Sequence, residues 1–199
     1  RIHDAHHGLI EAPDSLLIRG HNIEFDLINA RSIETRGNHP TTDYVNYFLG
    51  DDSSTWAGGV RQYEEVVMSD LYPKIDFALG SLGDYVKYEF RLAAGADLEN
   101  IAFKIGGIDT IYLKNNRLHM GNSIDLLVDN EPISWQIIDG SKRFVTSSYR
   151  LSGDTLSFDV ESYNPNYPLI IDPTLIFASY VGSSSNSWGA TATYDSLGN

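Results

Sequence analysis

The sequence predicts an all-β protein, built as an antiparallel β-sandwich or as a meander of many short strands. Apolar and polar residues alternate along most of the chain, which is the period of a strand with one buried face. Clusters of Gly, Asn, Asp and Ser separate the alternating runs and supply the residues that turns require. No window has the i, i+3, i+4, i+7 spacing of an amphipathic helix. Together these observations favour strands almost everywhere.

Several strands are predicted in the first half of the chain. Residues 21–27 and residues 85–92 alternate apolar with polar side chains, and a further run begins at Ile101. The most helix-like segment is Arg61–Asp70. Its β-branched pair, Val66-Val67, restricts the side-chain rotamers and favours a strand there as well.

Between residues 110 and 160 the sequence predicts a meander of short strands. The candidate strands are Thr110–Lys114, Arg117–Met120, Ser123–Leu127, Ile133–Ile138, Lys142–Ser148 and Thr155–Val160. The segments between them hold residues that tolerate positive φ or cap a turn with a side-chain oxygen. These turn segments are Asn115-Asn116, Asp129-Asn130, Asp139-Gly140 and Ser152-Gly153-Asp154. We therefore expect successive strands to form antiparallel hairpins.

The composition changes near residue 172, which predicts a domain boundary. A short apolar run, Leu169–Ile171, stops at Asp172-Pro173, and a second run, Thr174–Tyr180, follows at once. Proline fixes φ and donates no hydrogen bond to a sheet, so it suits a junction between two sheets. The sequence thus predicts a β-rich domain over residues 1–172 and the start of a second β module over residues 173–199.

The overall charge and the cysteine count argue against several function classes. The 199 residues include 14 Lys and Arg against 27 Asp and Glu, which gives a formal net charge of −13. A nucleic-acid partner is disfavoured because phosphate neutralisation needs a basic face. Membrane insertion is disfavoured because no run of about 18 apolar residues exists. The chain has no cysteine, so disulfides, thiol nucleophiles and cysteine-ligated metals are excluded.

Four segments, in order along the chain, carry a resemblance to a known family. They are Asn46–Asp52 with Trp56 after it, Leu71–Asp76, Tyr88–Phe90 with Ala94–Asp97 after it, and Pro168–Pro173. With these segments, residues 20–199 resemble the domain that precedes SBBP-type β-propeller repeats. The residues from Phe177 to Asn199 are similar to the beginning of the first such repeat.

The resemblance implies a cellular context and a neighbour. Such domains occur in large secreted bacterial proteins, many of them Bacteroidota cell-surface proteins with gliding-motility-associated, type IX secretion C-terminal domains. The resemblance implies an extracellular or cell-surface location and contact with propeller repeats of the same chain. It also implies that residues 1–172 lack the usual N-terminal segment of the domain and that residues 173–199 begin an SBBP-like repeat. It transfers no catalytic residue to this sequence.

Aromatic residues beside turn signals predict a binding surface. Trp56, Tyr63 and Tyr167 each lie next to such a signal, and an exposed ring flanked by Asp or Asn suits the face of a sugar. The alternative is that each ring caps the edge of a β core and keeps its polar tip at the surface. These three residues are the candidate ligand-binding residues, with a surface glycan as the candidate ligand.

Asp51 and Asp52, followed by Ser53 and Ser54, are the candidate metal ligands. Carboxylate and hydroxyl oxygens suit Ca²⁺, which takes six to eight hard ligands. The spacing is not that of an EF-hand loop, and the alternative is a turn in which the Asp side chains accept backbone N–H groups. A Ca²⁺ ion is the one cofactor that the sequence suggests.

Three functions remain open at this stage. The leading hypothesis is a non-enzymatic structural or adhesion module that packs beside a β-propeller in a secreted surface protein. The second is a carbohydrate-binding module, based on the aromatic residues near turns. The third is a glycan hydrolase that uses two carboxylates, although 27 acidic residues nominate no particular pair.

Overall fold

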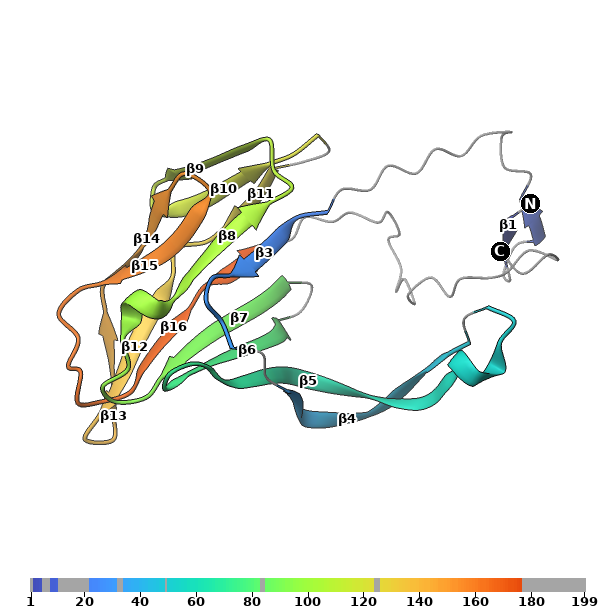
Figure 1. Cartoon of the computed structure of the whole chain (residues 1–199), viewed down its shortest axis with the longest axis horizontal. Helices are drawn as coiled ribbons and strands as arrows, with labels where there is room; N and C mark the ends of the chain where they lie inside the picture. The colour runs from blue at the N-terminus through green and yellow to red at the C-terminus, as the bar shows by residue number, and fades with distance from the viewer. Residues whose placement is uncertain are drawn as a thin grey trace.

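A computed structural model describes residues 2–4, 8–10, 22–31, 34–48, 50–82, 85–123 and 126–176 of the chain. In these residues the protein forms two large antiparallel sheets and a small separate pair of strands, β1 and β2 (Figure 1). The small pair has the bounds Ile2–Asp4 and Gly8–Ile10. Every strand pairing in the described residues is antiparallel, and the predicted all-β class is confirmed.

The larger sheet has eleven strands in the described residues. Strands β4, β5, β6 and β7 follow one another, and β16 and β17 lie along the other edge of β7. Beyond them, β12 pairs with β13, and β11 pairs with β10, which pairs with β9. The bounds are β4 Thr35–Tyr47, β5 Ala57–Tyr72, β6 Ile75–Leu82, β7 Tyr85–Leu92, β9 Thr110–Lys114, β10 Arg117–Gly121, β11 Leu126–Asp129, β12 Ile133–Ile138, β13 Ser141–Val145, β16 Leu169–Asp172 and β17 Thr174–Ile176.

In the described part of the chain, the smaller sheet has four strands in the order β14-β15-β8-β3. It lies against the larger sheet in Figure 1, so the two sheets form a sandwich. Two short 3₁₀ helices, η1 (Ser53–Thr55) and η2 (Leu98–Asn100), are each capped by the Asp before them, whose side chain accepts a backbone N–H. The bounds of the four strands are β3 Glu24–Leu27, β8 Ala102–Gly106, β14 Ser147–Ser152 and β15 Thr155–Val160.

Aromatic rings from both sheets form the centre of the core. Phe90 of β7 is fully buried, and its ring centroid lies 5.7 Å from that of Phe158 and 6.3 Å from that of Phe103, both on the smaller sheet. The side chains of Tyr88, Phe90 and Leu92 are buried as the period-2 pattern predicts. Burial of such rings is the main favourable contribution to folding in a domain of this kind.

Three of the four predicted hairpin turns are confirmed. Asn115-Asn116, Asp139-Gly140 and Gly153 all have positive φ and join β9 to β10, β12 to β13 and β14 to β15. The hairpin predicted at Asp129-Asn130 is wrong, because β11 pairs with β10 and β17 and does not pair with β12. Asp129 is buried instead of lying in an exposed turn.

The single strand predicted over Lys142–Ser148 is two strands that belong to different sheets. β13 ends at Val145 and lies at the edge of the larger sheet, while β14 begins at Ser147 in the smaller sheet. The carbonyl oxygen of Thr146, between them, accepts a 2.9 Å hydrogen bond from the N–H of Glu161. The chain therefore crosses from one sheet to the other at Thr146, inside one continuous β-like sequence run.

Pro173 does not separate two sheets, contrary to the sequence prediction. Leu169 pairs with Leu92 in β16, and Leu175 pairs with Val86 in β17, so both strands follow the same edge of β7 in one register. Pro173 interrupts this line because it has no N–H to donate. The run predicted over Thr174–Tyr180 is described only as far as Ile176, and the predicted strand over Trp188–Tyr194 lies outside the described residues. The domain boundary after residue 172 stays a prediction.

The hairpin of β4 and β5 projects away from the sandwich (Figure 1). The part of β5 from Glu65 onward also pairs with β6, while the part before Glu65 pairs only with β4 in the described residues. We call the projecting part, residues 39–64, the arm. Its register is shifted between Pro40 and Tyr44, where β4 has more residues than the facing part of β5.

Candidate functional site

Large hydrophobic side chains are exposed along both strands of the arm. Tyr44 is 64% exposed, and the others are between 37% and 51% exposed. They are Tyr44, Tyr47, Phe48, Trp56, Val60 and Tyr63. Among the described residues no second layer covers this two-stranded ribbon, and its large side chains are open to solvent. Clusters of exposed apolar side chains on a soluble protein mark interaction surfaces.

Hydrogen bonds and a ring contact order the tip of the arm. The indole N–H of Trp56 donates a 3.0 Å hydrogen bond to the carbonyl oxygen of Gly50, and its ring packs edge-on against Phe48 at a centroid distance of 5.3 Å. The N–H of Gly59 donates a 2.7 Å hydrogen bond to Oδ1 of Asn46 on the opposite strand. The exposed Trp56 ring is therefore held in place before any partner binds.

Tyr63 lies further down the arm and covers the backbone of the neighbouring strand. A Cβ atom added at Gly37 would lie 2.4 Å from the ring of Tyr63, so the ring occupies the space that any larger residue would need. Tyr63 faces Pro40 across the strand pair. Trp56 and Tyr63, two of the predicted ligand-binding residues, are thus on the same arm.

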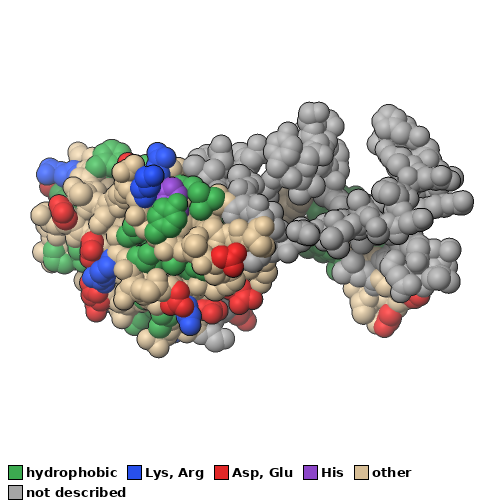
Figure 2. All heavy atoms as spheres, turned by 90° about the horizontal axis from the view of Figure 1, so that it is seen from above, with side chains coloured by type: hydrophobic (Ala, Val, Ile, Leu, Met, Phe, Trp, Pro, Cys, Tyr) green, Lys and Arg blue, Asp and Glu red, His purple; other side chains and the backbone are tan. Residues whose placement is uncertain are grey.

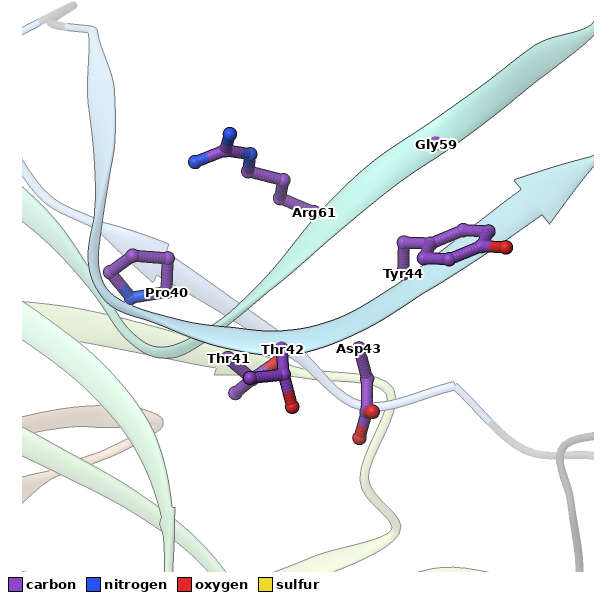
Figure 3. Close-up of a pocket in the computed structure, with 7 residues that line it drawn as sticks. All are labelled: Pro40, Thr41, Thr42, Asp43, Tyr44, Gly59 and Arg61. Atoms are coloured by element: carbon purple, nitrogen blue, oxygen red, sulfur yellow. The ribbon is translucent and has the colours of Figure 1, made fainter.

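A shallow hollow of about 400 Å³ lies where the register of the arm is shifted. Arg61 of β5 pairs with Tyr44 of β4, and both line this hollow. Figure 3 shows that Arg61 and Tyr44 lie on one side of the β4 ribbon, whereas Thr42 and Asp43 point to the other side. The polar groups do not converge on one point. Among the described residues that line the hollow, Asp43 is the one carboxylate, whereas hydrolysis of a glycoside uses two.

Tyr167 lies on the sandwich, apart from the arm. Its hydroxyl donates a 3.4 Å hydrogen bond to Oδ1 of Asp139, and its carbonyl oxygen accepts a 3.1 Å hydrogen bond from the buried side chain of Gln136. It thus belongs to the loop between β15 and β16. The structure does not bring Tyr167 together with Trp56 and Tyr63 in one site.

The predicted metal ligands lie in the turn at the tip of the arm. Oδ1 of Asp52 accepts a 2.9 Å hydrogen bond from the N–H of Ser54 and so caps η1. Hydrogen bonds from the hydroxyl and the backbone N–H of Ser54 lower the pKa of Asp52. In the described part of the chain, no three His, Asp or Glu side chains are arranged to hold a metal ion. Ca²⁺ binding at Asp51 and Asp52 stays a prediction.

Sequence reasoning missed Tyr44, Phe48 and Arg61, which the structure adds to the arm. One signal was present in the sequence. Aromatic residues stand on both sides of the Gly50-Asp51 turn without an alternating apolar partner face, so the strands there have no buried side. Because that pattern differs from the one at residues 85–92, it could have indicated a projecting ribbon.

On the face of the sandwich shown in Figure 2, charged side chains of both signs are mixed. Figure 2 shows acidic and hydrophobic side chains interspersed on one face, with basic side chains in small groups. This distribution agrees with the net charge of −13. No helix within the described residues has the length and apolar character needed to cross a membrane.

Comparison with known proteins places the chain in a family. No curated protein sequence and no solved structure matches it. Residues 1–174 match the family described as "Domain of unknown function (DUF7948)", so the match includes the arm and every strand of the two sheets except most of β17. Because this match covers most of the 199 residues, the chain belongs to the DUF7948 family.

Proposed function

We propose that this domain is a non-enzymatic docking module of a secreted cell-surface protein, and that its arm contacts a neighbouring β module of the same chain. One observation carries the proposal: exposed aromatic rings are concentrated on a projecting hairpin whose outer part pairs with no other described strand. The resemblance to domains that precede SBBP-type repeats supplies the neighbour, a β-propeller repeat, and the extracellular or cell-surface location.

The composition of the arm suits a protein interface. Tyr, Trp, Phe and Arg are enriched where partners bury surface, and each aromatic ring removes about 150–250 Å² from water when it is fully buried. Phe48 and Trp56 hold each other at the tip, so little side-chain entropy is lost when a partner covers them. Such preorganised rings are typical of the residues that contribute most to binding.

Hydrogen–deuterium exchange on the full-length protein tests this proposal. In the part of the chain that the structure describes, the amides of residues 57–64 lie in a two-stranded ribbon without a second layer, so they exchange fast unless a neighbour covers the arm. We expect slow exchange there in the full-length protein. Replacing Trp56 and Tyr44 by Ala in the same protein should speed exchange in the arm and leave the rest of the sandwich unchanged.

Phe144→Ala is the matched control. Phe144 is an aromatic residue on β13 that is 68% exposed, so it is as open to solvent as the arm residues but lies outside the arm. It should leave the exchange of the arm unaltered. Fast exchange of the arm in the unmodified full-length protein would contradict the proposal.

A carbohydrate-binding module is the second candidate, favoured by the hollow beside Tyr44 and Arg61. A tyrosine ring and a guanidinium group on one side of a strand could stack on a sugar and hydrogen-bond to its hydroxyls. A glycan array probed with the full-length protein tests it. Binding that disappears in Tyr44→Ala and persists in Phe144→Ala would favour this function over docking. Absence of binding to surface polysaccharides would contradict the carbohydrate-binding function.

A further inference from the structure

Lys87, Glu89 and Asp172 form a close cluster on the face of the larger sheet that points away from the smaller sheet. Nζ of Lys87 lies 2.9 Å from Oδ2 of Asp172 and 3.6 Å from Oε2 of Glu89. Lys87 and Glu89 are two residues apart on β7, so their side chains share one face. Asp172 ends β16, which pairs with β7 directly beside them. One amine thus lies between two carboxylates on adjacent strands.

The two carboxylates are more buried than the amine. The exposed fractions of the side chains are 15% for Asp172, 12% for Glu89 and 35% for Lys87. Oδ1 of Asp172 is buried and accepts no hydrogen bond from any described residue. Burial of this oxygen disfavours the charged form of the carboxyl group, whereas the 2.9 Å contact of Oδ2 with Lys87 favours it.

We propose that Lys87 and Asp172 condense to an intramolecular amide bond, with Glu89 carrying the proton that the reaction moves. Nζ of Lys87 first passes a proton to the carboxylate of Asp172, which leaves an amine beside a neutral acid. The nitrogen lone pair then attacks Cγ of Asp172. Oε2 of Glu89, whose Oε1 lies 2.6 Å from Nε of Arg91, accepts the second proton from the nitrogen and returns it to the departing hydroxyl group. One N–C bond forms, one C–O bond breaks and one water molecule leaves, without any oxidant or cofactor.

The surroundings of the cluster shift the pKa values of both Asp172 and Lys87. Burial raises the pKa of Asp172 and outweighs the contact with Lys87, which lowers it, so the net upward shift favours the neutral acid that the attack needs. Partial burial disfavours the charged form of Lys87, but its contacts with Asp172 and Glu89 outweigh this and raise its pKa. The first proton transfer is therefore the demanding step. It occurs across the shortest contact of the cluster, the 2.9 Å contact between Lys87 and Asp172.

The bond would connect the end of β16 to the central strand β7. Asp172 immediately precedes the Pro173 interruption, after which the chain continues into β17. A tensile force that enters from the C-terminal side would then reach β7 through a covalent bond instead of through the hydrogen bonds of β16. A surface protein whose domains are pulled apart would benefit from such a bond.

Mass spectrometry of the purified full chain under denaturing conditions tests the proposal. We expect an intact mass lower than the sequence mass by one water molecule, and a branched tryptic peptide that joins the segments around Lys87 and Asp172. Lys87→Arg keeps the positive charge but should restore the full sequence mass and lower the thermal unfolding midpoint. An unmodified mass, with both residues in linear peptides, would overturn the proposal.

Two further measurements separate this reaction from chance chemistry. Glu89→Gln keeps the Lys87–Asp172 contact but removes the proton carrier, so most molecules should remain unlinked; full cross-linking would overturn the role of Glu89. Lys104 and Asp154 form a matched control pair at 3.4 Å, with both side chains about half exposed. That pair should remain unlinked in the same peptide map, and equal linkage there would show that the cluster has no special reactivity.

Discussion

The hydroxyl of Tyr88 donates a 2.7 Å hydrogen bond to Oδ2 of Asp129, a carboxylate that is only 1% exposed. Tyr88 lies on β7 and Asp129 ends β11, with β17 between the two strands in the sheet. From the smaller sheet, the hydroxyl of Tyr149 donates a 2.8 Å hydrogen bond to the carbonyl oxygen of Asn130. Two tyrosines therefore attach the segment Asp129-Asn130 to both layers of the sandwich.

Asp129 should make the stability of the protein depend on pH. Burial raises the pKa of Asp129 to about 6, against 3.8 for the free side chain. The folded state therefore holds a proton between about pH 4 and pH 6 that the unfolded state has lost, so this residue's contribution to stability increases as the pH falls through that range. Above pH 6 the buried charge costs about 3 kcal/mol, from the difference between the two pKa values.

Asp129→Asn isolates this contribution. The amide is neutral at every pH and its oxygen still accepts the hydrogen bond from Tyr88, so we expect the variant to be more stable than the wild type at pH 7.5. The difference in the free energy of unfolding should disappear below about pH 4, as measured by urea denaturation across the pH range. A difference that does not change with pH would contradict this prediction.

Phe90 should be one of the most destabilising positions for truncation. It is fully buried, and its ring lies within 6.3 Å, centroid to centroid, of the rings of Phe77, Phe103 and Phe158. Phe90→Ala should lower the free energy of unfolding by about 3–5 kcal/mol, because it removes buried surface and leaves a cavity. Phe144→Ala, at an exposed position, should change it by less than about 0.5 kcal/mol. Chemical denaturation measures the free energy of unfolding of both variants. Equal decreases would contradict the prediction that Phe90 lies at the centre of the core.

Gly107 and Gly140 differ in whether a Cβ atom would fit, although both have a backbone conformation that favours glycine. Both have positive φ, 68° and 76°, which costs an alanine about 1 kcal/mol. A Cβ at Gly107 would also lie 2.1 Å from the carbonyl oxygen of Asn22, whereas one at Gly140 meets nothing within 4 Å. Gly107→Ala should therefore lower the thermal unfolding midpoint clearly more than Gly140→Ala. Equal shifts in the unfolding midpoint would contradict this prediction, because they would mean that the backbone at Asn22 moves away from the new Cβ atom without loss of stability.

Gln136 should control the order of the loop that carries Tyr167. Its buried Nε2 donates to the carbonyl oxygens of Asn164, Tyr167 and Pro168, and its Oε1 accepts a 2.8 Å hydrogen bond from the N–H of Asn164. Gln136→Met keeps the size of the side chain and removes these bonds. We expect a loss of about 1–3 kcal/mol in stability and faster amide exchange at Asn164. The exposed neighbour Ile137, replaced by Met, is the control and should change neither.

The sequence predicted where strands lie along the chain better than it predicted which strands pair with each other. Three predicted strands have the bounds observed for β9, β12 and β15: Thr110–Lys114, Ile133–Ile138 and Thr155–Val160. Their ends are predictable because neighbouring residues in the sequence favour turns. The pairing of β16 and β17 with β7 joins residues about eighty positions apart. Nothing in the local pattern distinguishes that edge from any other, so the prediction at Pro173 failed.

The candidate site was predictable only in part. Trp56 and Tyr63 were named from their turn signals and lie on the arm, but Tyr167 was named by the same criterion and lies on the sandwich. A turn signal indicates that a ring is near the surface without indicating which other rings are near it. The cluster of Lys87, Glu89 and Asp172 was missed for the same reason, because Asp172 reaches the other two only through strand pairing.

The sequence by itself determined the all-β class, most strand positions and the residues that face the core, because a period of two places alternate side chains on one face. The tertiary structure alone decided that the chain changes sheets at Thr146, that β4 and β5 project as an arm and that Asp129 is buried with Tyr88 as its hydrogen-bond donor. These features depend on which distant strands share hydrogen bonds. That choice is made by the packing of the whole core, which no single segment contains.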